Sequence, residues 1–166
     1  DGKVKILDRR IYPARVEFVT CGTHQEVAQA ITDMVTQSAG PYTAVPMGMA
    51  LAAHECRGRT AAEQMEYLRK AAHTISHARP TTVKRMALLC DLCLAEAERA
   101  LAAGEDTAQA IVNKTVELNN TRYERVAKIG KYLVDLFPEN GTVMTHCFAE
   151  TIVGMMLREC SERGKH

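Results

Sequence analysis

The sequence of 166 residues has no tryptophan, and aromatic residues make up only 5% of it. It lacks any apolar run near the roughly 18 residues that a membrane-spanning helix needs, and its first residues lack the apolar stretch of a signal peptide. Neither sign of charge dominates, because 21 Lys and Arg stand against 20 Asp and Glu, for a net charge of +1. These absences argue against a membrane protein and against a nucleic-acid-binding protein with a basic surface.

The composition that remains is that of a globular domain, with 46% hydrophobic and 25% charged residues. Alanine-rich stretches between residues 50 and 110 favour helices. Six cysteines are scattered through a chain with enough apolar residues for its own core, unlike a small disulfide-rich domain. We therefore expect free thiols and a reducing, cytoplasmic compartment. The cysteines are Cys21, Cys56, Cys90, Cys93, Cys147 and Cys160.

The first 26 residues have the pattern of short strands followed by a helix. Residues 3–8 and 14–20 are rich in β-branched side chains with Pro13 between them, which predicts a hairpin or small sheet. Thr23 and Glu26 have the spacing of a capping box, so a helix should begin there.

Four further helices are predicted by apolar spacing and by their end signals. We expect them from near Pro46 to Glu55, from a capping box at Thr60 to about His77, from Thr82 to about Ala103, and from Asp106 or Thr107 to before Pro138. With the small sheet they predict a mainly α-helical fold organised as a bundle.

The pattern changes near the C-terminus. Residues 141–145 resemble a short buried strand, and a helix is expected from about Ala149 to Arg163. A strand followed by a helix is typical of the first βα unit of a parallel sheet. We therefore expect a hairpin plus helical domain over residues 1–140 and the start of a Rossmann-like domain over residues 141–166, with the rest of that sheet outside this chain.

Common cofactor and metal motifs are missing. There is no P-loop, Gly-rich dinucleotide turn, nucleophile elbow or metalloprotease His-Glu pair, and we expect no cofactor. Cys90 and Cys93 have C-x₂-C spacing but lie in a helical pattern without a second pair, which favours core thiols over zinc. His73 and His77 share a helix face without a carboxylate between them, which favours a partly exposed face over a metal site. We therefore expect no metal.

Two residues are better placed for chemistry. Cys147 falls where the predicted strand would meet its helix, the edge at which open α/β sheets bind ligands. The helix N-terminus would stabilise a thiolate there, although a buried thiol packed under the sheet is the alternative. Arg79 ends a predicted helix just before Pro80, where its guanidinium could meet a phosphate. Taken alone, a solvated arginine at a helix end is the favoured interpretation.

Several motifs occur in the order found in one family. They are Leu7-Asp8 followed by Pro13, residues 16–21, the apolar positions of residues 27–34, and residues 48–53, 78–83 and 141–147. In this order they resemble the methylthioribose-1-phosphate isomerase family. Its relatives are the ribose-1,5-bisphosphate isomerases and the regulatory subunits of translation initiation factor 2B. The resemblance covers essentially the whole chain.

The resemblance implies an aldose–ketose isomerase of a sugar 1-phosphate, acting on methylthioribose 1-phosphate in methionine salvage or on a close variant. Cys147 matches the family's catalytic cysteine, and Arg79 matches an arginine that holds the substrate. The family's catalytic aspartate lies on the later Rossmann-like domain. The resemblance therefore implies a C-terminal half as partner, in the same protein or as a separate chain, and a homodimer formed through that half.

The sequence departs from the family at its phosphate-binding loop, which normally reads Arg-Gly-Ala-Pro-Ala-Ile-Gly. Residues 36–42 read Thr-Gln-Ser-Ala-Gly-Pro-Tyr instead. Ser38, Gly40 and Tyr42 still offer donors for phosphate binding, but a guanidinium binds phosphate more strongly than neutral hydrogen bonds do. Phe148 replaces a small polar residue that is usual after the cysteine, which makes the pocket more apolar.

Two other functions fit part of the sequence. A non-catalytic regulatory subunit like those of initiation factor 2B would keep the fold and sense a sugar phosphate or nucleotide. The lost Arg-Gly pair favours this hypothesis, and the retained Cys147 argues against it. A helical interaction domain without a small-molecule site is the third hypothesis, and it predicts that Cys147 behaves as an ordinary buried thiol.

Overall fold

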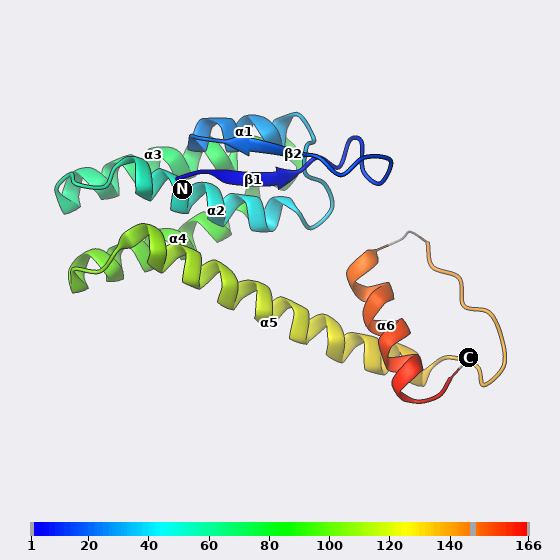
Figure 1. The fold of residues 1–166 in the computed structure, drawn as a ribbon. Helices are drawn as coiled ribbons and strands as arrows, with labels where there is room; N and C mark the ends of the chain where they lie inside the picture. Colours follow the sequence, from blue (N-terminus) through cyan, green and yellow to red (C-terminus); the bar gives the residue numbers. More distant parts are fainter. Residues whose placement is uncertain (1, 147–148, 166) are drawn as a thin grey trace. The chain divides into compact units, whose positions relative to one another are not determined.

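The computed structural model describes residues 2–146 and 149–165 (Figure 1). The chain forms two compact units, Asp1–Val116 and Glu117–His166, whose boundary falls inside one long helix. The domain boundary expected at residue 140 stays a prediction. Within the described ranges, no helix is long and apolar enough to cross a membrane.

A two-stranded antiparallel sheet begins the first unit, as the N-terminal pattern predicted. Strand β1 (Val4–Leu7) pairs with β2 (Phe18–Cys21), and Val4 lies opposite Cys21. Val4, Ile6 and Cys21 are buried, so one face of the sheet joins the core. In Figure 1 the strands lie beside the first two helices, with which they are in contact.

Four helices and a short 3₁₀ turn complete the packed part of this unit. They are α1 (His24–Thr32), α2 (Pro41–Glu55), α3 (Ala61–Ser76), η1 (Pro80–Thr82) and α4 (Val83–Ala103). The first turns of α5 (Thr107–Asp135) add Ile111 to the core. The largest fully buried side chains include Ile31, Met49, Leu68, Ile75, Met86 and Ile111. The mainly α-helical fold with a small sheet is thus confirmed.

Helix starts follow the capping signals of the sequence. Thr60 and Glu63 form a complete capping box before α3, in which each side chain accepts the other residue's amide. Before α1, the Thr23 hydroxyl accepts the amide of Glu26 (3.2 Å), but the Glu26 carboxylate accepts the amide of Gly22 instead of Thr23. Only half of the predicted box at α1 therefore forms.

Helix α2 begins earlier than its sequence predicted. It starts at Pro41, and Pro46 lies buried inside it. At the first position of the helix Pro41 loses nothing, because that amide has no partner within a helix. Pro46 cannot donate to the carbonyl of Tyr42 and so removes one hydrogen bond. The helix tolerates this loss because it is buried almost all round, and packing supplies most of its stability.

In the second unit, the C-terminal part of α5 contacts α6 (Glu150–Glu162). A Cβ at Gly130 would lie 3.2 Å from the Cβ of Met155, so the glycine permits this close approach. Arg163 joins the two helices through Glu159 of α6 (2.7 Å) and Asp135 of α5 (2.5 Å).

The strand expected at residues 141–145 is wrong. These residues are exposed and have no regular secondary structure. A β-strand needs a neighbour for its hydrogen bonds, and β1 with β2 form the only sheet within the described residues. The helix expected from about Ala149 to Arg163 is present as α6.

Candidate functional site

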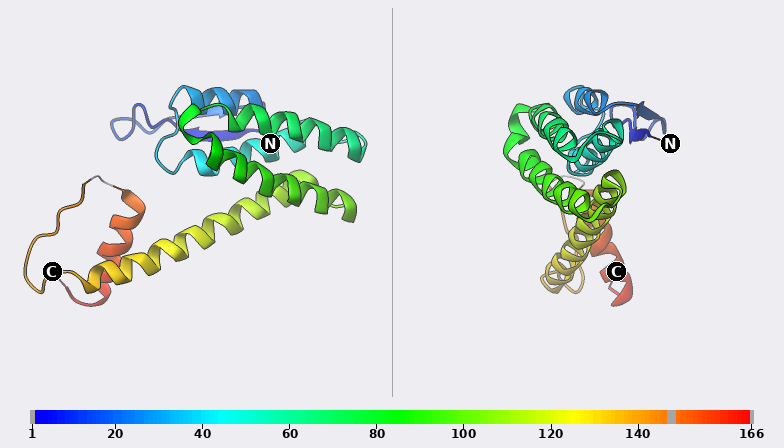
Figure 2. Two further views of the ribbon diagram at one scale, coloured as in Figure 1. Left: turned by 180° about the vertical axis from the view of Figure 1, so that it is seen from behind. Right: turned by 90° about the vertical axis from the view of Figure 1, so that its left-hand side faces the viewer.

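Two segments that the sequence singled out lie at the same end of the first unit. One is the loop of residues 36–42, which joins α1 to α2 and includes the first two residues of α2. The other is residues 79–85, which form η1 and the start of α4. Figure 2 shows both at the end opposite the turns that join α2 to α3 and α4 to α5. We call residues 36–42 and 79–85 together the loop end.

Contacts between helices fix the loop end. The hydroxyl of Thr32, the last residue of α1, donates to the carbonyl of Ala78 (2.8 Å), just before Arg79. The guanidinium of Arg85 lies over the ring of Tyr42, 5.1 Å from its centroid. Tyr42 belongs to the first turn of α2 and Arg85 to the first turn of α4. The N-termini of these two helices therefore lie together.

The opposite ends of α2 and α4 also meet. Ala53 near the end of α2 and Leu101 near the end of α4 both line a cavity of about 330 Å³. The two helices consequently run parallel, and both direct the positive ends of their dipoles toward the loop end.

The loop uses two of its amides internally. The amides of Gly40 and Tyr42 donate to the carbonyls of Gln37 and Ala39, at 2.9 and 3.1 Å. Pro41 has no amide hydrogen to offer. A ligand could therefore be bound by side chains together with the amides of residues 36–39.

Gly40 and Ser38 fix the shape of this loop. A Cβ at Gly40 would overlap the hydroxyl of the buried Thr36, so only glycine fits there. Ser38 has a φ of +54°, in the left-handed region that residues other than glycine seldom adopt. Its side chain is exposed. A role of Ser38 and Gly40 in phosphate binding stays a prediction.

Arg79 is half-buried and precedes η1 in an extended conformation, with φ −142° and ψ 111°, as a residue before proline prefers. Its carbonyl accepts the amide of Thr82 (3.1 Å). In the part of the chain that the structure describes, no carboxylate pairs with Arg79 or with Arg85. Two guanidinium groups and two helix N-termini give the loop end a positive character that suits an anionic group.

Cys147 and Phe148 lie outside the described residues. The proposed thiolate and the apolar wall beside it therefore stay predictions, and the described part of the candidate site is the loop end.

Among the described cysteines, Cys21, Cys56, Cys90 and Cys93 are buried free thiols and Cys160 is partly exposed. Burial raises the pKa of Cys90 and of Cys93 to about 12. These two residues are therefore core thiols on α4, as their helical pattern predicted.

Because of the buried thiols, the free energy of unfolding should fall at alkaline pH. Because the folded pKa of Cys90 and Cys93 is about 12 and the ordinary value is 9.0, their contribution is complete below pH 9 and is lost as pH rises toward 12. Urea unfolding at about pH 8 and about pH 10.5 should show this fall. Replacing both residues with alanine should flatten the pH dependence, and Cys160→Ala should leave it unchanged. An equal fall in the double variant would contradict the assignment.

The histidines on α3 stack on each other. The ring centroids of His73 and His77 lie 4.1 Å apart, and Nδ1 of His77 contacts the carbonyl of His73 (2.9 Å) and the hydroxyl of Ser76 (3.1 Å). Across the described ranges, no group of three or more His, Cys, Asp or Glu gathers in a way that could hold a metal.

A polar cluster at the start of α1 is absent from the sequence predictions. The Glu55 carboxylate accepts the amide of His24 (2.6 Å) and the hydroxyl of Tyr67 (2.6 Å), and its second contact with His24 is to ring Nδ1 (2.8 Å). Burial, and then the hydrogen bond to Glu55, raise the pKa of Tyr67 to about 12. The cluster joins the start of α1, the end of α2 and the middle of α3, and it gives the first amide of α1 an acceptor in addition to the cap that Thr23 provides.

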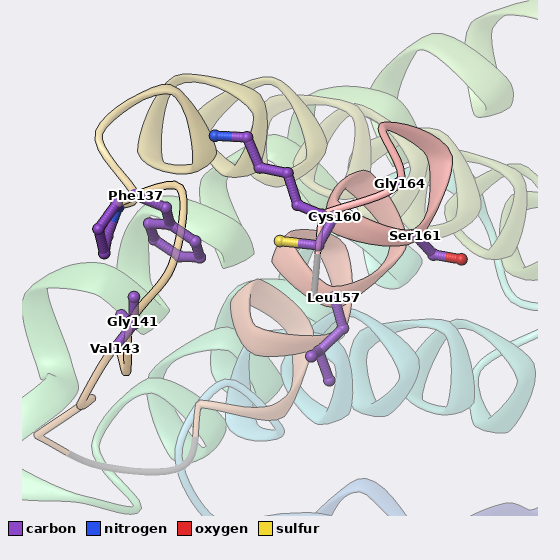
Figure 3. Close-up of a pocket in the computed structure, with 9 residues that line it drawn as sticks. Phe137, Gly141, Val143, Leu157, Cys160, Ser161 and Gly164 are labelled. Atoms are coloured by element: carbon purple, nitrogen blue, oxygen red, sulfur yellow. The ribbon is translucent and has the colours of Figure 1, made fainter.

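The second unit contains a cavity of about 450 Å³ between α6 and the segment after α5 (Figure 3). It is lined by Phe137, Val143, Leu157 and Cys160 among others, and the Cys160 thiol points into it. Lys165 also lines the cavity, and its ammonium donates to the carbonyl of Val134 (3.3 Å). The cavity is mostly apolar and brings no acid and base together.

Residues 39–166 match the initiation factor 2 subunit family. The chain is 31% identical to a methylthioribose-1-phosphate isomerase of Carboxydothermus hydrogenoformans, a match that covers 90% of this chain and 43% of that protein. It is 27% identical to a putative methylthioribose-1-phosphate isomerase of Archaeoglobus fulgidus, over 99% of this chain and 50% of that protein. The chain thus spans about half the length of these curated relatives.

Two solved structures resemble the fold. The delta subunit of translation initiation factor eIF-2B from A. fulgidus has a TM-score of 0.79 at 26% identity, over 98% of this chain and 49% of that chain. The 5-methylthioribose 1-phosphate isomerase of Pyrococcus horikoshii has a TM-score of 0.75 at 21% identity, over 99% and 48%. The second likeness concerns the fold alone.

Proposed function

Because the chain belongs to the initiation factor 2 subunit family, we propose that it is the N-terminal part of an aldose–ketose isomerase acting on a sugar 1-phosphate. Methylthioribose 1-phosphate, or a sugar phosphate close to it, is the proposed substrate. The similarity to proteins named methylthioribose-1-phosphate isomerase supports this choice. The observation that supports it most directly is the positive loop end, where Arg79 has no carboxylate partner among the described residues.

In the proposed mechanism the loop end holds the phosphate, and Arg79 donates charge-assisted hydrogen bonds to it. The phosphate on the anomeric oxygen prevents the ring opening that a free sugar undergoes. Isomerisation moves one hydrogen from C2 to C1 while the bond between C1 and the ring oxygen breaks and the proton of the C2 hydroxyl passes to that oxygen. C2 is oxidised and C1 is reduced, with no net redox change. No redox cofactor is therefore needed. Cys147 and an acid from the C-terminal half would act at these two carbons, either as proton-transfer groups or beside a hydride shift.

The C-terminal half is proposed as a Rossmann-like partner that completes the site and forms a homodimer. Large apolar side chains on the second unit support the need for such a covering surface. They include Leu136, 80% exposed, and Met144, 93% exposed.

The test is to purify the complete protein and follow conversion of methylthioribose 1-phosphate to methylthioribulose 1-phosphate by NMR. We expect the ketose to accumulate to equilibrium without added cofactor. Ribose 1,5-bisphosphate, assayed in parallel, tests the nearest alternative substrate. If neither sugar phosphate is converted, the isomerase proposal is wrong.

A second candidate is a non-catalytic regulatory subunit. The likeness to the delta subunit of eIF-2B favours it, as does a loop without the Arg-Gly pair. It predicts binding of a sugar phosphate or nucleotide, measured by calorimetry, with no turnover of either sugar phosphate.

A further inference from the structure

Arg85 is the basic residue that the structure brings to the candidate phosphate loop. Its guanidinium lies over the Tyr42 ring, and Tyr42 is the last residue of the loop. Sequence reasoning alone could not find this pairing, because the two residues belong to different helices. Arg85 is exposed, and its described contacts include no carboxylate that would neutralise its charge.

The loop needs a cation from elsewhere. Its own arginine position is occupied by a threonine, Thr36, whose buried side chain packs against Gly40. Two of its amides, those of Gly40 and Tyr42, already bond within the loop. An anion at this loop would therefore depend on side-chain charge that the loop itself does not provide.

We propose that Arg85, held over the ring of Tyr42, supplies the guanidinium for the substrate's phosphate and so replaces the arginine that the loop lacks. This inference rests on the proposed isomerase function and names a residue that determines its phosphate affinity. The stacked ring limits the directions that the guanidinium takes, which lowers the entropy lost when it binds the anion. Arg79 and Arg85 then face one anion from the same end of the bundle.

The geometry also assigns Tyr42 a role different from the one its hydroxyl implies. If the ring serves as a platform, the aromatic face matters and the hydroxyl does not. Tyr42 is then a positioning residue that acts through Arg85.

The experiment uses the complete protein and measures kcat and KM for the sugar phosphate. Arg85→Gln should raise KM about tenfold or more, the change expected when a charge-assisted hydrogen bond to phosphate is lost, with kcat changed less than about twofold. Arg85→Lys should recover part of the affinity, because it retains the charge but not the planar fork. The matched control is Arg69→Gln, which removes an exposed guanidinium from α3, outside the loop end, and should leave KM unchanged.

Variants of Tyr42 test whether its ring supports Arg85 or its hydroxyl donates a hydrogen bond to the phosphate. Tyr42→Phe should keep the KM of the unaltered protein, and Tyr42→Leu should raise it severalfold. An equal rise in both variants would make the hydroxyl the phosphate donor and overturn the platform role. If Arg85→Gln and Arg69→Gln raise KM equally, Arg85 contributes only to the general surface charge, and the proposal fails.

A binding measurement distinguishes this proposal from the isomerase function. Inorganic phosphate should raise the thermal midpoint of the complete protein more than chloride at equal ionic strength, and Arg85→Gln should remove the difference. If phosphate stabilises the protein in a way that depends on Arg85 but no sugar phosphate is converted, the phosphate site is supported and the isomerase function is rejected. Turnover with an unchanged KM in Arg85→Gln would keep the isomerase and reject the role of Arg85. If the protein shows no turnover and no protection by phosphate, both the isomerase function and the role of Arg85 are wrong.

Discussion

Cys147→Ser in the complete protein should abolish measurable isomerisation and leave the fold intact. A serine hydroxyl stays protonated near neutral pH, whereas a thiol at a helix N-terminus ionises readily. The loss of one group that transfers a proton in the transition state lowers kcat by about a hundredfold to ten-thousandfold. The measurement is turnover of methylthioribose 1-phosphate, with circular dichroism to confirm that the helices are retained.

The matched control is Cys160→Ser, which alters a partly exposed thiol in the second unit and should keep full activity. Labelling with iodoacetamide adds a readout that does not depend on substrate. Cys147 should react faster than the buried Cys90 and Cys93. Full turnover in Cys147→Ser would end the catalytic assignment, and slow labelling of Cys147 would favour the interaction-domain hypothesis.

Glu55→Ala should lower the free energy of unfolding by about 2–4 kcal/mol, because one carboxylate satisfies the His24 amide and the Tyr67 hydroxyl and contacts the His24 ring. Without it, these buried or half-buried groups lose their partner, and the first amide of α1 loses its acceptor. Chemical unfolding of the variant and of the unaltered protein measures the difference.

Glu66→Ala is the control for this variant. Glu66 is exposed on α3 and pairs with the exposed Lys70, so its loss should cost less than about 0.5 kcal/mol. If the two alanine variants lose similar stability, the Glu55 cluster contributes no more than a surface ion pair.

Helices could be predicted from the sequence because their signals are local. Thr60 and Glu63 lie three residues apart and form the box that their spacing predicted. The start of α2 at Pro41 was harder to predict, because burial by other helices decides whether the interior Pro46 is tolerated. Residues 141–145 have the composition of a strand, but strand formation depends on a neighbour whose presence a local pattern cannot show.

The candidate site could be predicted only as far as its motifs reach. The motif at residues 78–83 pointed to Arg79, and the altered loop pointed to weaker phosphate binding. Arg85 and Glu55 belong to no motif, because the role of each depends on a contact with a residue of another helix. Basic residues in the first turn of a helix are common, and only the fold shows that Arg85 meets Tyr42.

The short length of α1 has a consequence for the order of folding. With nine residues, α1 is below the roughly 12–15 residues at which an isolated helix becomes even marginally stable in water. Thr23 caps it locally, but its first amide is accepted by Glu55, at the far end of the next helix. The helix can therefore persist only after α2 has docked. Its amide hydrogens should exchange with solvent at the rate at which the contact between α1 and α2 opens. Because the chain from α1 leads directly into the loop of residues 36–42, that loop should become ordered in the same docking step.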